Sequence, residues 1–391
     1  MRKFSFMEKF LDGVEVEWMA LGEMAEIKRG TSITKRNVTL GDVPVIAGGR
    51  KPAYFHNVSN RNGQTIVIAG SGAYAGFISW WEQPIFVSDA FTVKPYEELL
   101  SKYCYYWLQS MQQQLHELKS GGGVPHVYPR DIVPLQIPIP CPNNPEKSLA
   151  IQAEIVRILD TFTELTTELT TELTARKKQY NYYRDQLLSF DDGEVEWKAL
   201  GEVAEYSKAR IKFEELDKTN YVGVENLLQN RLGKTESSRV PETGNFIQYS
   251  EQDILIGNIR PYLKKIWHAD RIGGTNSDVL VIHTTDNAVN PRYLYQVLAD
   301  DKFFEYNMQH AKGAKMPRGN KAKIMEYPIP CPNNPKKSLE EQSRIVAILD
   351  KFDTLTLSIS EGLPREIELR QKQYEYYRDL LLSFPKAESD A

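Results

Sequence analysis

Two long segments of the chain, residues 148–190 and 338–384, repeat apolar side chains at spacings of three and four. The positions are Ile155, Ile158, Phe162, Leu165 and Leu169 in the first segment, and Ile345, Ile348, Phe352 and Leu355 in the second. This period is typical of an amphipathic helix and of a coiled-coil seam. We therefore predict two long helices whose seams pack on each other. The alternative is a helix in each domain that faces only its own core.

The stretches before these helices have a different pattern. Short apolar runs alternate with clusters of glycine, asparagine and proline, as expected for strands and turns. In the first stretch, strands are predicted at 43–47, 65–69 and 85–87, and a helix at 103–118. In the second, strands are predicted at 221–224, 253–257 and 278–283, and a helix at 291–309. Both stretches are therefore predicted to be mixed α/β domains.

The chain contains two copies of one plan. The motif P-I-P-C-P-N-N-P-E-K-S-L at 138–149 returns as P-I-P-C-P-N-N-P-K-K-S-L at 328–339. The opening V-E-W-M-A-L-G-E-M-A-E at 16–26 returns as V-E-W-K-A-L-G-E-V-A-E at 195–205. The residues between these repeats do not match. Repeats report structural units and the segments between them carry function, so two unlike inserts indicate two different recognition surfaces on one scaffold.

Each proline-rich motif is predicted to open a helix. Its alternating prolines force an extended approach, and Asn144-Pro145 or Asn334-Pro335 could supply a cap followed by proline at the first helical position. In the second copy, Ser338 and Glu341 could form a capping box.

A smaller repeat lies inside the first predicted helix, where T-E-L-T occurs three times between Thr163 and Thr174. The copies of the plan are 190 residues apart at Pro138 and Pro328 but 194 apart at Tyr180 and Tyr374. The second repeat is therefore expected to be one helical turn longer, because four residues are close to one turn. We interpret the tetrads as a length-adjusting element, with drift in a solvated helix as the alternative.

Composition sets broad limits. With 391 residues, 41% of them hydrophobic, the chain is long enough for two cores, and its net charge of −4 gives no global basic field. The three cysteines form no C-x-x-C pair, which fits a reducing compartment. No apolar run approaches a membrane span, and the amphipathic segment at 1–13 has acids where a signal peptide needs an apolar core. We expect a soluble, cytoplasmic protein.

Basic residues gather in loops of both variable stretches. K-S-G-G-G-V-P-H-V-Y-P-R at 119–130 and K-G-A-K-M-P-R-G-N-K-A-K at 312–323 occupy equivalent places before the proline motifs. One such cluster is more often a solvated face, but recurrence at equivalent places favours phosphate binding, and Arg and Asn can also read base edges. The candidate DNA-binding residues are Lys28, Arg29, Lys35, Arg36, Arg50, Lys51, Ser71, Tyr74, Lys119, His126, Arg130, Asn258, Arg260, Lys264, Lys265, Lys312, Lys315, Arg318, Asn320, Lys321 and Lys323.

Catalytic motifs are absent or weak. Gly233-Lys234-Thr235 lacks the earlier glycine of a phosphate-binding loop. Gly70-Ser71-Gly72 with Gly76 departs from G-x-G-x-x-G, and a strand turn at a DNA-facing surface explains it as well or better. Asn290-Pro291-Arg292-Tyr293 is only loosely similar to the N-P-P-Y loop of amino-methyltransferases. The histidines form no metal-spaced pair, so no catalytic residue, metal or cofactor is expected.

Together these motifs resemble the specificity subunits of type I restriction-modification systems, in the subfamily with tandem T-x-E-L tetrads in the central conserved helix. The resemblance covers the whole chain. It rests on W-x-x-L-G-E, the proline motif, Q-x-x-I-V-x-I-L-D-x-F, the tetrads and Y-x-Y-Y-R-D-x-L-L-S-F. It implies an α+β fold in which two mixed α/β target-recognition domains are separated by two long conserved helices. These helices would form an antiparallel coiled coil with an internal pseudo-twofold repeat.

The resemblance also implies a function. Each recognition domain would read one half of a bipartite, asymmetric site in double-stranded DNA, while two methyltransferase subunits dock on the scaffold and nuclease-motor subunits join the full complex. The specificity subunit itself would carry no cofactor and no chemistry. Its expected parts are a segment at 1–13, recognition domains at 14–147 and 191–337, helices at 148–190 and 338–384, and a tail at 385–391.

Two alternatives come from other classes of protein. A stand-alone DNA adenine methyltransferase would need a cofactor pocket and an N-P-P-Y loop, and neither is found. A structural coiled-coil adaptor would need no DNA contact, against which the paired basic loops argue. No motif identifies the DNA sequence of either half-site.

Overall fold

The computed structural model describes residues 14–121, 123–191, 193, 195–332, 335–358 and 360–384. The expected segment at 1–13 and the tail at 385–391 lie outside these residues. The chain divides into two compact units. The first combines the residues up to Thr166 with those from Arg370 onward, and the second is Thr167–Leu369. The first unit therefore joins the two ends of the chain, and the units do not follow a linear division of the sequence.

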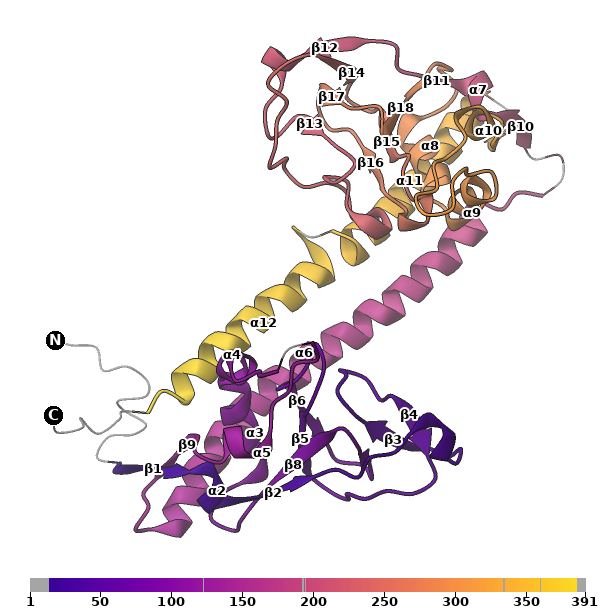
Figure 1. Cartoon of the computed structure of the whole chain (residues 1–391). Helices are drawn as coiled ribbons and strands as arrows, with labels where there is room; N and C mark the ends of the chain where they lie inside the picture. Colours follow the sequence, from indigo (N-terminus) through magenta and orange to yellow (C-terminus); the bar gives the residue numbers. More distant parts are fainter. Residues whose placement is uncertain are drawn as a thin grey trace, which may run out of the picture. The chain divides into compact units, whose positions relative to one another are not determined.

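The first unit is built around a four-stranded antiparallel sheet in the order β2–β8–β5–β6 (Figure 1). These strands are β2 (Ala25–Arg29), β8 (Ala90–Pro95), β5 (Thr65–Ala69) and β6 (Ile78–Trp81). A three-stranded sheet contains β4 (Tyr54–His56), β3 (Val43–Ile46) and β7 (Phe86–Val87), with β3 and β7 parallel. A ribbon pairs β1 (Val16–Ala20) with β9 (Gln136–Pro140). The short helices are α2 (Leu21–Met24), η1 (Lys35–Asn37), α3 (Ser101–Ser110), α4 (Gln112–Glu117) and α5 (Pro129–Ile132).

The second unit repeats the four-stranded central sheet and the two-stranded ribbon, but its outer sheet has four strands where the first unit has three. Its central sheet, β11–β18–β15–β16, contains β11 (Ala204–Tyr206), β18 (Val279–Thr284), β15 (Ile254–Gly257) and β16 (Ile266–His268). The outer sheet contains β12 (Arg210–Lys212), β14 (Asn245–Tyr249), β17 (Gly273–Thr275) and β13 (Tyr221–Val222), again with one parallel pair, β13 and β17. A ribbon pairs β10 (Val195–Ala199) with β19 (Pro328–Pro332). The short helices are α7 (Leu200–Val203), η2 (Phe213–Glu215), η3 (Gln229–Arg231), η4 (Pro261–Leu263), α8 (Pro291–Leu298), α9 (Asp301–Gln309) and α10 (Lys321–Met325).

The variable stretches thus share one fold although their sequences do not match. All six predicted strands are confirmed, with ends that differ by one or two residues. The helix predicted at 103–118 is divided at Met111 into α3 and α4. The helix predicted at 291–309 is also two helices, because Asp300 caps α9 by accepting a hydrogen bond from Lys302 N at 2.8 Å.

The proline-rich ribbons differ in register by two residues. Trp18 lies opposite Pro138 in the first copy, whereas Trp197 lies opposite Pro330 in the second. In the sequence repeat the counterpart of Pro330 is Pro140. A shift of two residues keeps every side chain on its original face, whereas a shift of one would turn the buried face outward.

The two long helical patterns fold differently. The first forms α6 (Pro145–Leu187), a continuous helix of 43 residues that includes every tetrad. The second forms α11 (Pro335–Thr356) and α12 (Gly362–Leu381). Gly362 has a φ of +72°, and a Cβ there would lie 2.3 Å from the carbonyl oxygen of Thr354. The additional residues of the second repeat are therefore accommodated in a turn, and the expectation of one longer continuous helix was wrong.

The predicted helix caps have mixed outcomes. Asn144 caps α6, since its side chain accepts a hydrogen bond from Lys147 N at 3.0 Å. The capping box at Ser338 is wrong, because α11 has already begun at Pro335. Ser338 Oγ instead accepts a hydrogen bond from Gln342 Nε2 at 2.8 Å, inside the helix. Asn334 lies outside the described residues.

The core of each unit includes residues from the end of a long helix. In the first unit, Ile155 and Leu159 of α6 are fully buried and belong to the same cluster as Leu381 and Phe384, at the end of α12. This arrangement agrees with the alternative in which the first half of the seam faces its own core. Phe162, farther along the seam, stacks on Tyr377 of α12 with ring centroids 5.2 Å apart, so the two helices also pack on each other.

The second unit has the matching arrangement. Ile345 and Leu349 of α11 are fully buried and belong to the same cluster as Tyr180, near the end of α6. Phe352 stacks on Tyr183 with ring centroids 5.6 Å apart. The equivalent pair in the first unit is Phe162 and Tyr377. Within the described part of the chain, none of the helices combines the length and hydropathy needed to span a bilayer.

A fully buried glutamine joins each long helix to the short helix packed beside it. Gln152 Oε1 accepts a hydrogen bond from Leu100 N at 2.9 Å, and Nε2 donates to Glu98 O at 3.1 Å. Gln342 repeats both contacts, accepting from Asn290 N at 2.8 Å and donating to Ala288 O at 3.0 Å. These bonds satisfy backbone groups at the start of α3 and α8.

We predict that Gln152→Leu destabilises the first unit by about 1–3 kcal/mol, because the hydrogen bonds of this fully buried side chain to the Leu100 N–H and the Glu98 carbonyl are lost. Hydrogen exchange read by mass spectrometry should show faster exchange at residues 96–108 and unchanged exchange at 286–298. The matched variant Gln342→Leu should give the reverse pattern. Faster exchange in both units with either variant would contradict the prediction that each glutamine stabilises only its own unit.

Candidate nucleic-acid interface

In both units a glycine-containing loop is held against a turn of the central sheet. Ser120 and His126 exchange backbone hydrogen bonds of 3.0 and 2.9 Å, and His126 also forms a β-bridge with Ser71, between β5 and β6. In the second unit, Lys312 and Arg318 exchange bonds of 2.9 and 2.8 Å, and Arg318 bridges Ile259, between β15 and β16. The two basic loops therefore have the same backbone geometry.

The turns against which these loops pack also match. The positions with positive φ are Gly72 and Gly76 in the first turn and Arg260 and Lys264 in the second. Tyr74 and Tyr262 occupy equivalent places between them and are 42% and 49% exposed. The glycine pattern at 70–76 is thus explained by backbone geometry at a surface turn, because glycine adopts positive φ without strain.

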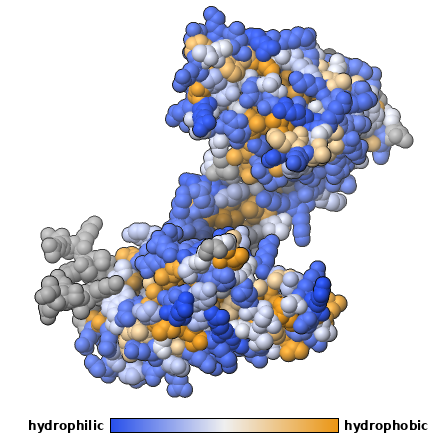
Figure 2. Space-filling view, viewed as in Figure 1, coloured by the Kyte–Doolittle hydropathy of each residue, from blue (hydrophilic) through white to orange (hydrophobic). Residues whose placement is uncertain are grey.

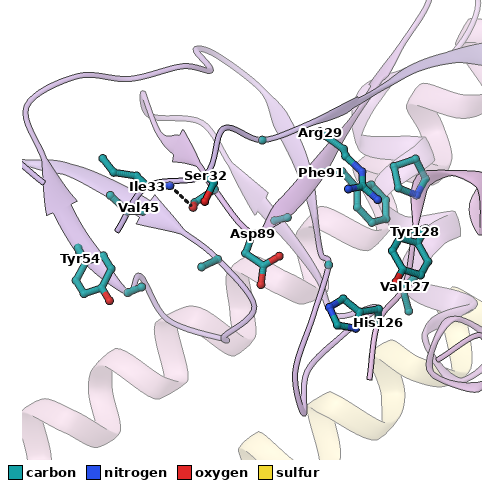
Figure 3. A pocket seen from close by; sticks show the side chains of 17 residues that line it. Arg29, Ser32, Ile33, Val45, Tyr54, Asp89, Phe91, His126, Val127 and Tyr128 are labelled. Atoms are coloured by element: carbon teal, nitrogen blue, oxygen red, sulfur yellow. Dashed lines mark hydrogen bonds between the residues drawn. The ribbon is translucent and has the colours of Figure 1, made fainter. Parts of the chain in front are cut away.

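A hollow of about 460 Å³ lies beside the first basic loop (Figure 3). The carboxylate of Asp89 lies between Tyr54 of β4 on one side and His126 and Tyr128 on the other. Arg29 lies at the end of β2, and its guanidinium carbon is 5.5 Å from the centre of the Tyr128 ring. The hollow therefore offers a cation, a carboxylate and flat rings within one small surface.

Aromatic rings organise several of the candidate cations. The guanidinium of Arg130 lies 4.8 Å from the Tyr128 ring centre, and His126 stacks on the same ring at 5.7 Å with an interplanar angle of 7°. Arg50 lies 4.9 Å from the Tyr74 ring centre. Such cation–π contacts contribute about 0.5–1 kcal/mol at exposed sites, enough to bias the direction of a long side chain.

The other lysines and Arg36 of the first unit do not line this hollow. Lys119 Nζ donates to Ala73 O at 3.0 Å, so its ammonium group lies against the turn that contains Tyr74. Lys28 alternates with Arg29 along β2, so its side chain points to the opposite face of the sheet. Lys35, Arg36 and Lys51 are exposed and do not line the hollow.

In the second unit the exposed candidates surround the equivalent loop. They are Arg260, Lys312, Lys315, Arg318 and Lys321. Arg318 differs from the others because its Nη1 donates to Asp278 Oδ1 at 2.7 Å, with 53% of the Arg318 side chain still exposed.

Four further candidates have structural partners. Lys264 Nζ lies 2.9 Å from Asp301 Oδ1, and Lys323 Nζ lies 2.6 Å from Glu326 Oε2. Burial tends to raise the pKa of Asp301, but the hydrogen bond from Lys264 and the charge of Arg231 outweigh it and lower that pKa. Lys265 Nζ donates to Val224 O at 2.6 Å, and burial lowers its pKa. Asn320 caps α10 by accepting from Ala322 N at 3.2 Å.

The structure contradicts the expectation that Asn258 faces DNA. Its side chain is only 5% exposed, and a Cβ on Gly319 would lie 2.8 Å from its Oδ1. Asn258 occupies the place of Gly70 in the first turn, and its backbone N–H donates to Asp278 O as that of Gly70 donates to Asp89 O. Its role is therefore in the packing of the turn against the loop.

Asp89 and Asp278 were missed at the sequence level, because they lie outside the basic and glycine-containing clusters from which the candidates were drawn. Each directly precedes the second strand of its central sheet, β8 or β18. A signal exists, since Ser88-Asp89 and Ser277-Asp278 both stand before an apolar run. The loops carry a second signal. In each loop a glycine, Gly121 or Gly313, stands three positions before the start of a tripeptide, Val-Pro-His or Met-Pro-Arg.

Hydrophilic residues cover most of the face shown in Figure 2, with apolar residues between them. Within the described residues, no group of three or more His, Cys, Asp and Glu side chains could hold a metal ion. The chemistry of the interface therefore consists of hydrogen-bond donors, acceptors and cations on a shared backbone frame.

Two units with the same central sheet, each presenting a loop on the turn of that sheet, define a bipartite recognition scaffold. The family model described as "Type I restriction modification DNA specificity domain" matches the chain twice, over residues 13–177 and 193–369. The chain belongs to this family of type I restriction-modification specificity proteins, which confirms the resemblance drawn from its motifs.

Individual relatives agree with this assignment. The chain is 36% identical to the Escherichia coli type I restriction enzyme EcoR124I/EcoR124II specificity subunit, over 100% of this chain and 99% of that protein. It is 30% identical to the Escherichia coli EcoprrI specificity subunit, over 92% and 93% of the two chains. The crystal structure of the S subunit from M. genitalium matches with a TM-score of 0.64 at 18% identity, over 96% of this chain and 98% of that one. The expected fold class is therefore confirmed.

Proposed function

We propose that this chain is the non-catalytic DNA-recognition subunit of a type I restriction-modification complex. Each unit reads one half of a bipartite, asymmetric site in double-stranded DNA. Methylation and cleavage belong to partner subunits. The observation that carries this proposal is the repeated loop and turn, which hold different side chains, His126 in one unit and Arg318 in the other, on the same backbone frame.

The residues around these loops suit DNA. Exposed lysines and arginines next to glycines can approach phosphates, which fixes the protein on the duplex without reading its sequence. Side chains held by the backbone bridges can reach base edges, which supplies the sequence preference. The domains at 14–147 and 191–337 are the proposed recognition modules, and the exposed candidate cations around the two loops, with Ser71 and Tyr74, form their DNA-facing surface.

Structural contacts explain the one weak motif that favoured the alternative of a stand-alone adenine methyltransferase. Asn290 caps α8 by accepting a hydrogen bond from Arg292 N at 2.8 Å, and Arg292 Nε lies 2.9 Å from Asp350 Oδ1. Tyr293 is fully buried and donates to Pro330 O at 2.9 Å. These polar groups serve the packing of α8 against α11 and β19, so they are not available to hold a substrate base.

The partners follow from the same proposal. Two methyltransferase subunits dock on the repeated helix ends, where the equivalent Tyr182 and Tyr376 are 61% and 65% exposed. A surface that occurs twice on one chain fits two copies of one partner. Nuclease-motor subunits join the full complex, and the protein works in the cytoplasm, where the DNA is.

We predict that replacing residues 27–136 with the matching stretch of a relative changes only one half of the recognised site, because the modules read DNA separately. Methylation mapping in cells that carry the reconstituted complex measures both halves at once. The matched control replaces the equivalent stretch of the second unit and should change only the other half. Altered preference in both halves, or methyl transfer by the isolated chain, would contradict the proposal.

We predict that Lys312→Ala, Lys315→Ala and Lys321→Ala each weaken binding to all DNA sequences, because each removes a cation that binds a phosphate. The slope of log affinity against log salt should become shallower by about one unit for each phosphate that is no longer bound. Titration of labelled duplex with the methyltransferase complex at several salt concentrations measures this slope. Lys351→Ala, an exposed position on α11, removes the same charge outside the loops and should leave the slope unchanged. An unchanged slope in all three loop variants would show that the loop faces solvent.

The tetrads are proposed to set the distance between the half-sites. Inserting one T-T-E-L unit after Leu173 lengthens α6 by about 6 Å and rotates the remainder of the helix by about 40°. One base pair of B-DNA advances about 3.4 Å and turns by about 35°. The rotation matches one base pair, and a modest distortion of the DNA absorbs the remaining translation.

We therefore predict that the insertion keeps both half-sites and lengthens the unread spacer by one base pair, and that deletion of one unit shortens it by one. Methylation mapping of the two variants gives half-sites and spacer together. A spacer that stays constant would show that the tetrads do not set the distance, and altered half-sites would show that they do more than that.

A further inference from the structure

The ion pair between Asp278 and Arg318 is unexpected on a surface that binds phosphates. Its N–O distance is 2.7 Å, and 53% of the Arg318 side chain and 29% of the Asp278 side chain remain exposed. A carboxylate repels phosphates and cancels much of the attraction that the guanidinium would otherwise exert on them. A cation that served only to hold the DNA backbone would gain nothing from this partner.

The same pair suits a base edge. Guanine presents two uncharged acceptors, O6 and N7, in the major groove, and an arginine can donate to both at once. A guanidinium has five N–H donors, so one bond to Asp278 leaves enough for such a bidentate contact. We propose that Arg318, oriented by Asp278, reads a guanine in the half-site of the second unit. This inference rests on the proposed function and names one base of its substrate.

The backbone on both sides of the pair is fixed. Arg318 exchanges two hydrogen bonds with Lys312 and bridges Ile259, so its Cα is held from two directions. Asp278 stands at the start of β18, and its N–H donates to Asn276 Oδ1 at 3.0 Å. Both ends of the side-chain pair are therefore held before DNA binds, which reduces the entropy that a flexible arginine would lose on contacting a base.

The equivalent place in the first unit has the opposite hydrogen-bonding character. His126 stands where Arg318 stands, and its Nδ1 lies 2.8 Å from Val124 O. Because a carbonyl only accepts, Nδ1 carries the hydrogen, and Nε2 of the neutral ring is an acceptor. Asp89, the counterpart of Asp278, accepts a hydrogen bond from Ser71 Oγ. The same backbone arrangement thus presents hydrogen-bond acceptors, His126 and Asp89, in one unit and a donor, Arg318, in the other. This difference fits a site whose two halves have different sequences.

The test compares three variants of the reconstituted methyltransferase complex by binding to duplexes with single base-pair changes. Arg318→Ala should reduce discrimination at one G·C pair of the second half-site by roughly 10- to 100-fold, with the first half-site unaffected. Arg318→Lys keeps the charge but cannot form the bidentate contact, so it should lose the same discrimination at an unchanged salt slope. Asp278→Asn should increase affinity for all sequences and steepen the salt dependence, because it frees the cation for phosphates.

Lys315→Ala is the matched control in the same loop and should weaken all sequences equally without changing any base preference. The inference is overturned if Arg318→Ala behaves like Lys315→Ala, or if the second half-site contains only A·T pairs. A complex of the natural chain that reads no bipartite site at all would instead overturn the proposed function. The two failures are therefore distinguishable, and circular dichroism of each variant checks that the fold is retained.

Discussion

The packing of a helix end into each hydrophobic core is the interaction on which the rest of the structure depends. Leu381 and Phe384 complete the first core, and Tyr180 completes the second, where it belongs to the same cluster as Ile345 and Leu349 of α11. In the second unit this end is also tied by Arg184, which is 3% exposed and donates to Gln296 Oε1 at 2.6 Å. The core of each unit therefore includes residues from a long helix as well as from its own sheet.

Recognition surfaces can diverge on this scaffold because backbone bonds, and not side chains, define the loop and turn. The first turn has Gly72 at a position of positive φ, whereas the second has Arg260 there, at a cost of roughly 1–2 kcal/mol. Both choices give the same frame, since the bridges from His126 and Arg318 use only main-chain groups. Side chains at the surface are then free to change with the DNA sequence that is read.

The net charge of this protein does not indicate what its individual surfaces bind. A net charge of −4 gives no hint of a polyanionic partner, yet exposed cations gather around both loops. The acids that accompany them are as informative, because Asp89 and Asp278 stand at equivalent places beside unlike partners. Asp278 pairs with a cation, Arg318, whereas Asp89 accepts a hydrogen bond from the hydroxyl of Ser71.

The sequence by itself determined the two-copy plan, the mixed α/β units, the long helices, the family and the basic loops. These features follow from local signals, such as helical and strand periodicity, proline and glycine punctuation, and the close return of motifs. Tertiary structure alone decided that the loops pack on the turns at Ser71 and Ile259, that Asn258 is buried, and that Asp278 holds Arg318. It also placed the break before Gly362, where a continuous helix was expected. The contacts at the loops and turns join residues tens of positions apart, and tertiary packing brings these residues together in ways that no local pattern records.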